Sequence, residues 1–207
     1  LSGNHDLGNR PTRESIARFE REFGDDHLAF WAKGSYNIVL NSSLFFDPSG
    51  APDLFEAQFA WFKERLQYAK EAEASPIFVF AHHPWFLYDE DENPENMKGS
   101  SPLHDFGIDA SIGDSYFVVP PAIRRRVLAL MKEYGVDAAF AGHFHQNMVS
   151  TTSFGMSMIV TSALSVILRS TGIPETFNEP RNQQGMRIVD VRSNGSFAHR
   201  FVPLDDE

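Results

Sequence analysis

Histidine and asparagine residues gather in three short blocks of the sequence. Gly3-Asn4-His5-Asp6 stands near the start, Ala81-His82-His83-Pro84 in the middle and Gly142-His143-Phe144-His145 further on. Nitrogen and oxygen donors without sulfur suit Mn, Fe, Zn or Co better than a soft metal. Two neighbouring ions that share a hydroxide can polarise a phosphoryl oxygen and supply a nucleophile near neutral pH. These residue types favour metal-dependent hydrolysis, although a His-x-His pair alone is equally consistent with surface loop residues.

Apolar runs must position these blocks. Residues 76–81 and 136–141 are continuous apolar stretches typical of strands that are covered on both faces. On a helix, His143 and His145 would point about 200° apart, so they can meet at one site only on extended backbone. The alternation of helices with strands that end in functional residues predicts an α/β layered fold with the site at the carboxyl ends of the strands.

The other elements follow from periodicity and stop signals. We expect a loop at residues 3–9 and a helix at 13–23, capped by Thr12, with Ile16, Phe19 and Phe23 on one face. A second helix begins with Asp53 and Glu56 in a capping-box-like pattern, and a third begins at Pro120-Pro121 and ends at Gly135. Strands are predicted at 36–41, 156–161, 186–191 and 196–202, the last two forming a hairpin through Asn194-Gly195.

Composition narrows the class of protein. The 207 residues suffice for one domain, and the 19 phenylalanines indicate aromatic packing between layers. A net charge of −10 argues against binding to nucleic-acid backbones and against a polybasic membrane anchor. The absence of cysteine excludes disulfides and thiolate chemistry, and no apolar run could span a bilayer, so we expect a cytoplasmic protein without membrane partners.

Two stretches break the regular pattern. Residues 88–115 are acidic and rich in Gly, Ser and Pro, and residues 169–184 are similarly irregular. We interpret both as excursions from the core, and we expect the first to be the most mobile part of the chain and to border the site. The carboxylates at 89–95 do not fit the spacing of an EF-hand, so a solvated face is favoured over a calcium site.

The three blocks together resemble the last three signature blocks of the calcineurin-like metallophosphoesterases. Segments at 23–26, 39–42, 116–117, 185–189 and 199–201 extend the resemblance to a serine/threonine phosphatase branch of that family over nearly the whole chain. The resemblance implies a four-layer αββα sandwich with a site for two metal ions (Mn, Fe or Zn) and a phosphorylated protein or small molecule as substrate.

Roles within the site also follow from the resemblance. Asn4, His82 and His143 would be ligands of the second metal and His145 of the first, whereas His5 would protonate the leaving oxygen. His83 would lie at the rim or behind the ligands, and Trp85 and Phe144 could form an aromatic rim, although ordinary packing explains these aromatics equally well.

The family's earlier blocks, an Asp-x-His and a Gly-Asp-x-x-Asp segment, are absent from these 207 residues, and so is the opening β-α-β portion of the fold. The chain begins at Leu1 without methionine, so we expect it to be the C-terminal part of such a domain, inactive on its own. The alternatives are a non-catalytic or incomplete binding module of the same fold, and a nucleotide phosphodiesterase.

Overall fold

The computed structural model describes residues 1–94, 114–165, 167 and 183–204. Its helices are α1 (Asn4–Leu7), α2 (Arg13–Phe23), α3 (Ser42–Phe46), α4 (Pro52–Glu71) and α5 (Pro121–Tyr134), with 3-10 turns η1 (Pro48–Gly50) and η4 (Asp114–Tyr116). Its strands are β1 (Leu28–Ala32), β2 (Ser35–Val39), β3 (Ile77–Phe80), β4 (Ala138–Ala141), β5 (Met148–Thr151), β6 (Ser157–Val160), β7 (Gly185–Val191) and β8 (Phe197–Pro203).

The described strands form two sheets. Six strands make a mixed sheet in the order β1-β2-β3-β4-β6-β5, and β7 and β8 form a separate antiparallel hairpin. The four central strands, β2, β3, β4 and β6, run parallel to one another, whereas the edge strands β1 and β5 are antiparallel to their neighbours. The carboxyl ends of the central strands therefore lie at one edge of the sheet.

Alternation along β3 separates the two cores of the molecule. Ile77 and Val79 pack in the core that the sheet shares with α4 and α5. Phe78 and Phe80 point to the opposite face, where they meet Phe140 and the hairpin residue Phe197. Ring centroids there are 5.0–5.4 Å apart, as in favourable aromatic pairs. Phenylalanine thus fills the space between the sheets, as the composition predicts.

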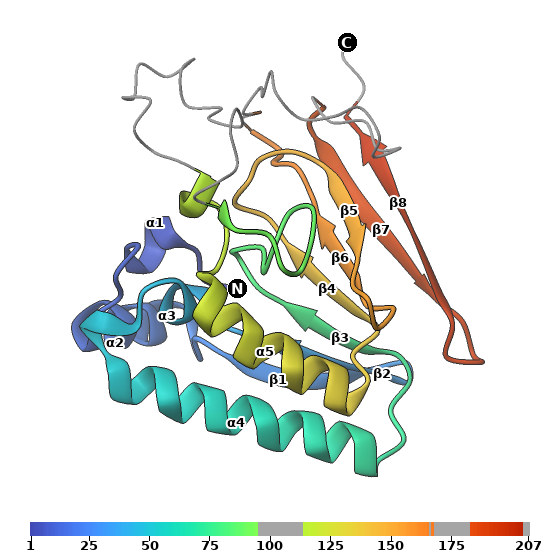
Figure 1. The fold of residues 1–207 in the computed structure, drawn as a ribbon, viewed down its shortest axis with the longest axis horizontal. Coiled ribbons are helices and arrows are strands. Elements are labelled where there is room, and N and C mark those ends of the chain that lie inside the picture. Colours follow the sequence, from blue (N-terminus) through green and yellow to red (C-terminus); the bar gives the residue numbers. More distant parts are fainter. Residues whose placement is uncertain (95–113, 166, 168–182, 205–207) are drawn as a thin grey trace.

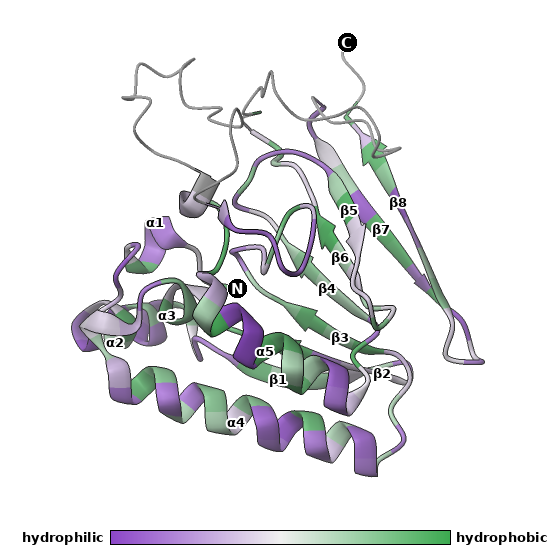
Figure 2. Cartoon of the chain, viewed as in Figure 1, coloured by the Kyte–Doolittle hydropathy of each residue, from purple (hydrophilic) through white to green (hydrophobic). Residues whose placement is uncertain are grey.

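The layers follow from this alternation. Figure 1 shows α4 and α5 beside one face of the six-stranded sheet and the β7–β8 hairpin beside the other. In Figure 2 the central strands are mostly hydrophobic, whereas hydrophobic and hydrophilic residues alternate along α4. The chain is an α/β sandwich as predicted. Its described elements form three of the four expected layers: the helices, the six-stranded sheet and the β7–β8 hairpin.

Helix ends follow local chemistry with one exception. Thr12 caps α2 by accepting a hydrogen bond from the Ser15 backbone N–H at 3.1 Å, an interaction worth about 1 kcal/mol. Gly135 ends α5 in the left-handed conformation at φ 73°, which glycine adopts without steric cost. The predicted capping box at Asp53 is wrong. Helix α4 begins one residue earlier after Ala51, and the Asp53 carboxylate instead pairs with Arg13.

Other expectations need correction. Residues 4–7 of the predicted loop form the single turn α1, because the Asp6 carboxylate accepts the Gly3 N–H at 2.8 Å. Phe23 is 71% exposed, so the core face of α2 ends before it. Strands β1 and β5 were not predicted. Most of the two predicted excursions lies outside the described residues.

The described start of the first excursion is held in place. Glu92 accepts the backbone N–H groups of Leu87 and Tyr88 at 2.9 and 2.8 Å, and the buried Arg124 guanidinium contacts the carbonyl oxygens of Trp85 and Glu92. Residues 87–92 thus have defined hydrogen-bond partners, and the expected mobility of the excursion stays a prediction. Among the described helices, none is both long enough and apolar enough to cross a bilayer.

Candidate metal centre

Three segments that are distant in sequence meet at the carboxyl edge of the central strands. His82 follows β3 and His143 follows β4, and parallel pairing of these strands places the two loops side by side. A hydrogen bond from the Gly142 N–H to the His82 carbonyl oxygen, at 3.1 Å, extends the pairing into the loops. Asn4 reaches the same place from α1.

Three donor atoms converge there. His82 Nε2 lies 2.9 Å from Asn4 Oδ1 and 3.1 Å from His143 Nδ1. A metal ion with ligand bonds of about 2.1 Å holds neighbouring ligand atoms about 3.0–3.4 Å apart, which follows from tetrahedral or octahedral geometry. The observed spacing fits three ligands of one ion. The structure therefore brings together the three residues predicted to share a metal.

Outer partners aim each donor. The Asn4 amide nitrogen donates to Asn9 Oδ1 at 3.0 Å and to the Tyr116 hydroxyl at 3.1 Å, which leaves Oδ1 facing His82. His143 Nε2 lies 3.0 Å from the Tyr116 carbonyl oxygen. A carbonyl can only accept, so Nε2 carries the proton and the lone pair of Nδ1 faces the cluster. Tyr116 thus orients two of the three donors, and sequence reasoning did not assign it this role.

Ser42 fixes the loop that carries His82. Its hydroxyl oxygen accepts the backbone N–H groups of His82 and His83 at 3.0 and 2.9 Å, and it also lies 2.9 Å from His83 Nδ1. Gly3 lies directly against the His82 ring, where an added Cβ would stand 3.0 Å from Cε1. The position of this imidazole therefore depends on the close approach that glycine allows.

The backbone of the third block, Gly142-His143-Phe144-His145, is strained. His143 and His145 have φ of 61° and 56°, in the left-handed region that side-chain-bearing residues seldom adopt. Such a conformation costs on the order of 1–2 kcal/mol per residue and persists where the surroundings enforce it. The two imidazoles are thus not presented by a simple extended segment as predicted, but by two left-handed turns on either side of Phe144.

Burial keeps the central imidazoles neutral. Burial lowers the pKa of His82 to about 4, with a further contribution from the nearby His145. Burial and the charge of His82 lower the pKa of His143 to about 3. Both rings are uncharged at neutral pH. His143 Nδ1 offers its lone pair directly, whereas His82 Nε2 faces two acceptors and must shift its proton to Nδ1 before it binds a cation.

Among the described residues, the three converging donors, Asn4, His82 and His143, include no carboxylate. Within the described part of the chain, no group of three or more His, Cys, Asp or Glu side chains is arranged to hold a metal, so the amide of Asn4 is an essential member of the donor set. Asp6, which neighbours His5, is engaged in capping α1. His145 is half-buried and His5 is exposed. The proposed roles of these two histidines stay predictions.

Of the alternatives left open, burial favours packing over an aromatic rim for Trp85 and Phe144, and a place behind the ligands for His83. Trp85, Phe144 and His83 are all fully buried. Trp85 packs edge-on against Phe45 with centroids 5.6 Å apart, and Phe144 packs on Phe117 at 5.3 Å. His83 stacks on Phe46 and lies 4.4 Å from the His143 ring. These three side chains support the donor loops from behind and cannot contact an incoming substrate.

Comparison with known proteins places the chain among phosphoesterases. A family profile described as calcineurin-like phosphoesterase matches residues 1–147, which include all three His/Asn blocks. The chain is 36% identical over 99% of its length to the serine/threonine-protein phosphatase CPPED1 of Danio rerio, and 32% identical over its full length to the protein of that name from Homo sapiens.

The matches differ in extent. The chain spans about half the length of the curated relatives it matches, namely 56% and 55% of these two. A solved structure titled GAP50, the anchor in the inner membrane complex of Plasmodium, shares the fold with a TM-score of 0.55 at 18% identity, covering 86% of this chain and 49% of its own. From the profile match and the geometry of its strand ends, we conclude that the chain belongs to the calcineurin-like phosphoesterase family.

Proposed function

We propose that the protein containing this chain is a metal-dependent phosphomonoesterase that acts on phosphoserine or phosphothreonine in proteins. The observation that carries the proposal is the convergence of Asn4, His82 and His143 at one sheet edge. The substrate class rests on the relatives, which are named as serine/threonine-protein phosphatases.

Within the proposal, Asn4, His82 and His143 hold one ion and His145 belongs to a second. Bound Mn, Fe or Zn would stabilise charge on the phosphoryl oxygens and lower the pKa of a coordinated water. His5 donates the proton to the departing alkoxide oxygen. Its exposed position next to Asn4 leaves it accessible to a substrate bound at the cluster.

The donor set predicts the metal content of the 207-residue chain. Two adjacent dications repel each other strongly unless anionic oxygen lies between them. Two imidazoles and one amide supply none. We expect at most one ion per chain, weakly bound, and no phosphatase activity. A polypeptide that also carries the Asp-x-His and Gly-Asp-x-x-Asp blocks should hold two ions.

Elemental analysis of both polypeptides after identical dialysis tests this expectation. Two tightly held ions in the 207-residue chain would show that other ligands complete the site. In the longer polypeptide, hydrolysis of an aryl phosphate with Mn²⁺ should be abolished by His82→Ala together with metal content. Full activity of that variant would contradict the proposal.

A second experiment isolates His5. A general acid contributes about 10²–10⁴-fold, so His5→Ala should lower turnover by that factor while metal content stays unchanged. The loss should shrink for p-nitrophenyl phosphate, whose leaving group needs no proton. Equal losses on alkyl and nitrophenyl phosphates would exclude the acid role.

In the part of the chain that the structure describes, the donor cluster has no carboxylate, which also favours a second candidate, a family member that keeps the fold as a binding module without catalysis. The two candidates separate in the longer polypeptide. Two bound ions without turnover on any phosphomonoester would favour the binding module.

A further inference from the structure

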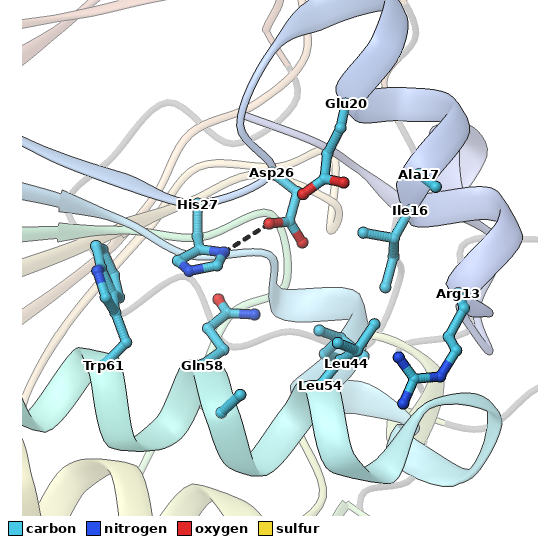
Figure 3. A pocket seen from close by; sticks show the side chains of 11 residues that line it. Arg13, Ile16, Ala17, Glu20, Asp26, His27, Leu44, Leu54, Gln58 and Trp61 are labelled. Atoms are coloured by element: carbon cyan, nitrogen blue, oxygen red, sulfur yellow. Dashed lines mark hydrogen bonds and ion pairs between the residues drawn. The ribbon is translucent and has the colours of Figure 1, made fainter.

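A cavity of about 510 Å³ opens between α2, α4 and the segment before β1 (Figure 3). None of the donor-cluster residues lines it. Its volume lies in the range of about 300–1,000 Å³ that small-molecule sites occupy. The proposed phosphatase chemistry assigns no role to this cavity.

One part of the wall is apolar. Ile16 from α2, Leu44 from α3 and Leu54 from α4 line it, and Trp61 lies about two turns after Leu54 on α4. The Trp61 ring meets the His27 imidazole edge-on, with centroids 4.6 Å apart and planes at 77°. The cavity can therefore remove a hydrocarbon or aromatic body from water, which is worth about 25 cal/mol per Å² of apolar surface.

The polar part of the wall is negative. Asp26 is buried, and its two oxygens accept from His27 Nδ1 at 2.5 Å and from the Asn41 amide at 2.7 Å. Burial raises the pKa of Asp26, but the hydrogen bonds from His27 and Asn41 outweigh it, so the pKa is lowered and the group is ionised. In Figure 3, Glu20 projects from α2 toward the same part of the cavity.

No opposing charge is available in the lining for an anionic ligand. Arg13 is the one cationic Lys or Arg among the lining residues, and it is already paired with Asp53. The Glu20 carboxylate forms no ion pair with any residue that the structure describes. A phosphate or carboxylate would meet uncompensated negative charge here, whereas a cation would offset it.

We propose that this cavity binds an organic monocation, an ammonium group on an aromatic or aliphatic body. The ammonium lies near Glu20 and the Asp26–His27 pair, and the body lies against Ile16, Leu44 and Leu54. The Trp61 ring adds the attraction that indole exerts on cations. A free amine and a lysine side chain of a peptide share this chemistry.

Titration calorimetry on the 207-residue chain tests the proposal with phenethylammonium chloride as probe. Binding should saturate with one site, and the neutral isostere 2-phenylethanol should bind at least about tenfold more weakly, because a charge-assisted hydrogen bond contributes about 1.5–3 kcal/mol. Lack of saturation, or equal binding of the neutral compound, overturns the proposal.

Matched variants on α2 locate the ammonium group. Glu20→Gln should weaken phenethylammonium about tenfold or more, whereas Glu22→Gln, on the same helix but outside the lining, should leave it within about twofold. Both glutamates are exposed, so neither change threatens folding. Equal effects of the two changes would show attraction by the general acidic surface and overturn the site.

The amide-capped peptide Ala-Lys-Ala distinguishes a free amine from a peptide lysine as the natural ligand. If the peptide binds at the same site, the ligand is a peptide lysine. If phenethylammonium binds and the peptide does not, the ligand is a free amine.

Discussion

Two regions of this molecule place an imidazole beside buried oxygen, with opposite results. At the donor cluster, His82 and His143 face each other and the neutral amide of Asn4. At the cavity, His27 faces the carboxylate of Asp26. The Asp26 carboxylate engages His27 in a short hydrogen bond, whereas His82 and His143, buried together beside an amide, stay uncharged and can bind a cation. The partner, not the histidine, decides which kind of site forms.

Metal affinity should show the largest difference between the donor cluster and the cavity. His143→Ala removes a donor atom and should weaken binding of Mn²⁺ or Zn²⁺ to the 207-residue chain by more than about 100-fold, above the 10–100-fold loss typical of outer-shell changes. His27→Ala removes an imidazole that is hydrogen-bonded to the Asp26 carboxylate, and it should change the metal affinity by less than about twofold. Calorimetry on both variants decides the matter, and equal losses would mean that the metal binds elsewhere.

The pH dependence of stability separates the two regions next. The folded-state pKa values of His82 and His143, about 4 and about 3, lie below the unfolded value of 6.5, so the unfolded chain binds more protons between these limits. Stability is therefore fully present above pH 6.5 and falls as the pH drops through about 4. For His82 alone the loss is on the order of 3 kcal/mol, at about 1.36 kcal/mol per pKa unit.

Urea unfolding in the presence of EDTA measures this loss. His82→Gln should flatten the dependence between pH 6.5 and pH 4, although the variant is less stable at pH 7. The Asp26 carboxyl acts in another window, because its lowered pKa contributes stability above its ordinary value of 3.8 that is lost only below it. A wild-type curve that stays flat down to pH 4 would contradict the burial of the cluster.

Much of the donor cluster could be predicted from the sequence because its positions follow from strand order. Apolar runs marked β3 and β4, and parallel pairing of such strands brings their ends together. The two unpredicted strands β1 and β5 lie at the edges of the sheet. Four of the five β1 residues are exposed, so buried and exposed residues do not alternate along this strand, and β5 is only four residues long. Short or exposed edge strands leave a weak periodic signal.

Burial in the loops escaped prediction for a different reason. Trp85 follows a donor block, which invites a role at the rim, yet α3 supplies Phe45 to cover it. Likewise Asp26 and His27 are adjacent in sequence, but the hydrogen bonding of the buried Asp26 carboxylate also depends on Asn41, fifteen positions away. Such contacts depend on how loops and helices pack, and one-dimensional spacing does not encode that.

The carboxylate at the cavity should matter for stability more than for metal binding. Asp26→Asn replaces one acceptor oxygen by a donor nitrogen, which then faces His27 or Asn41. A hydrogen bond to a charged group contributes about 1.5–3 kcal/mol, and we expect a loss of about that size at pH 7. Asp25→Asn, an exposed neighbour, is the control and should change the free energy of unfolding by less than about 0.5 kcal/mol. Equal effects of the two changes would show that the hydrogen bonds of Asp26 to His27 and Asn41 do not stabilise the fold.

The smallest effect comes from the partner of a donor rather than from a donor. Tyr116→Phe removes the hydroxyl that accepts from Asn4 and keeps the backbone carbonyl that orients His143. The Asn4 amide then keeps only Asn9 as acceptor and can turn its oxygen away from His82. Outer partners of this kind contribute about 10–100-fold to metal affinity, and we expect about tenfold, the lower limit, because one of the two restraints remains.

Asn9→Ala should lower the metal affinity by a similar factor, and the double variant should lower it more than either, because both restraints hold one amide group. Metal titration of the three variants measures these factors. If Tyr116→Phe binds metal as tightly as the wild type while Asn4→Ala does not, the hydroxyl plays no part in aiming the amide, and His143 is the one donor that Tyr116 positions.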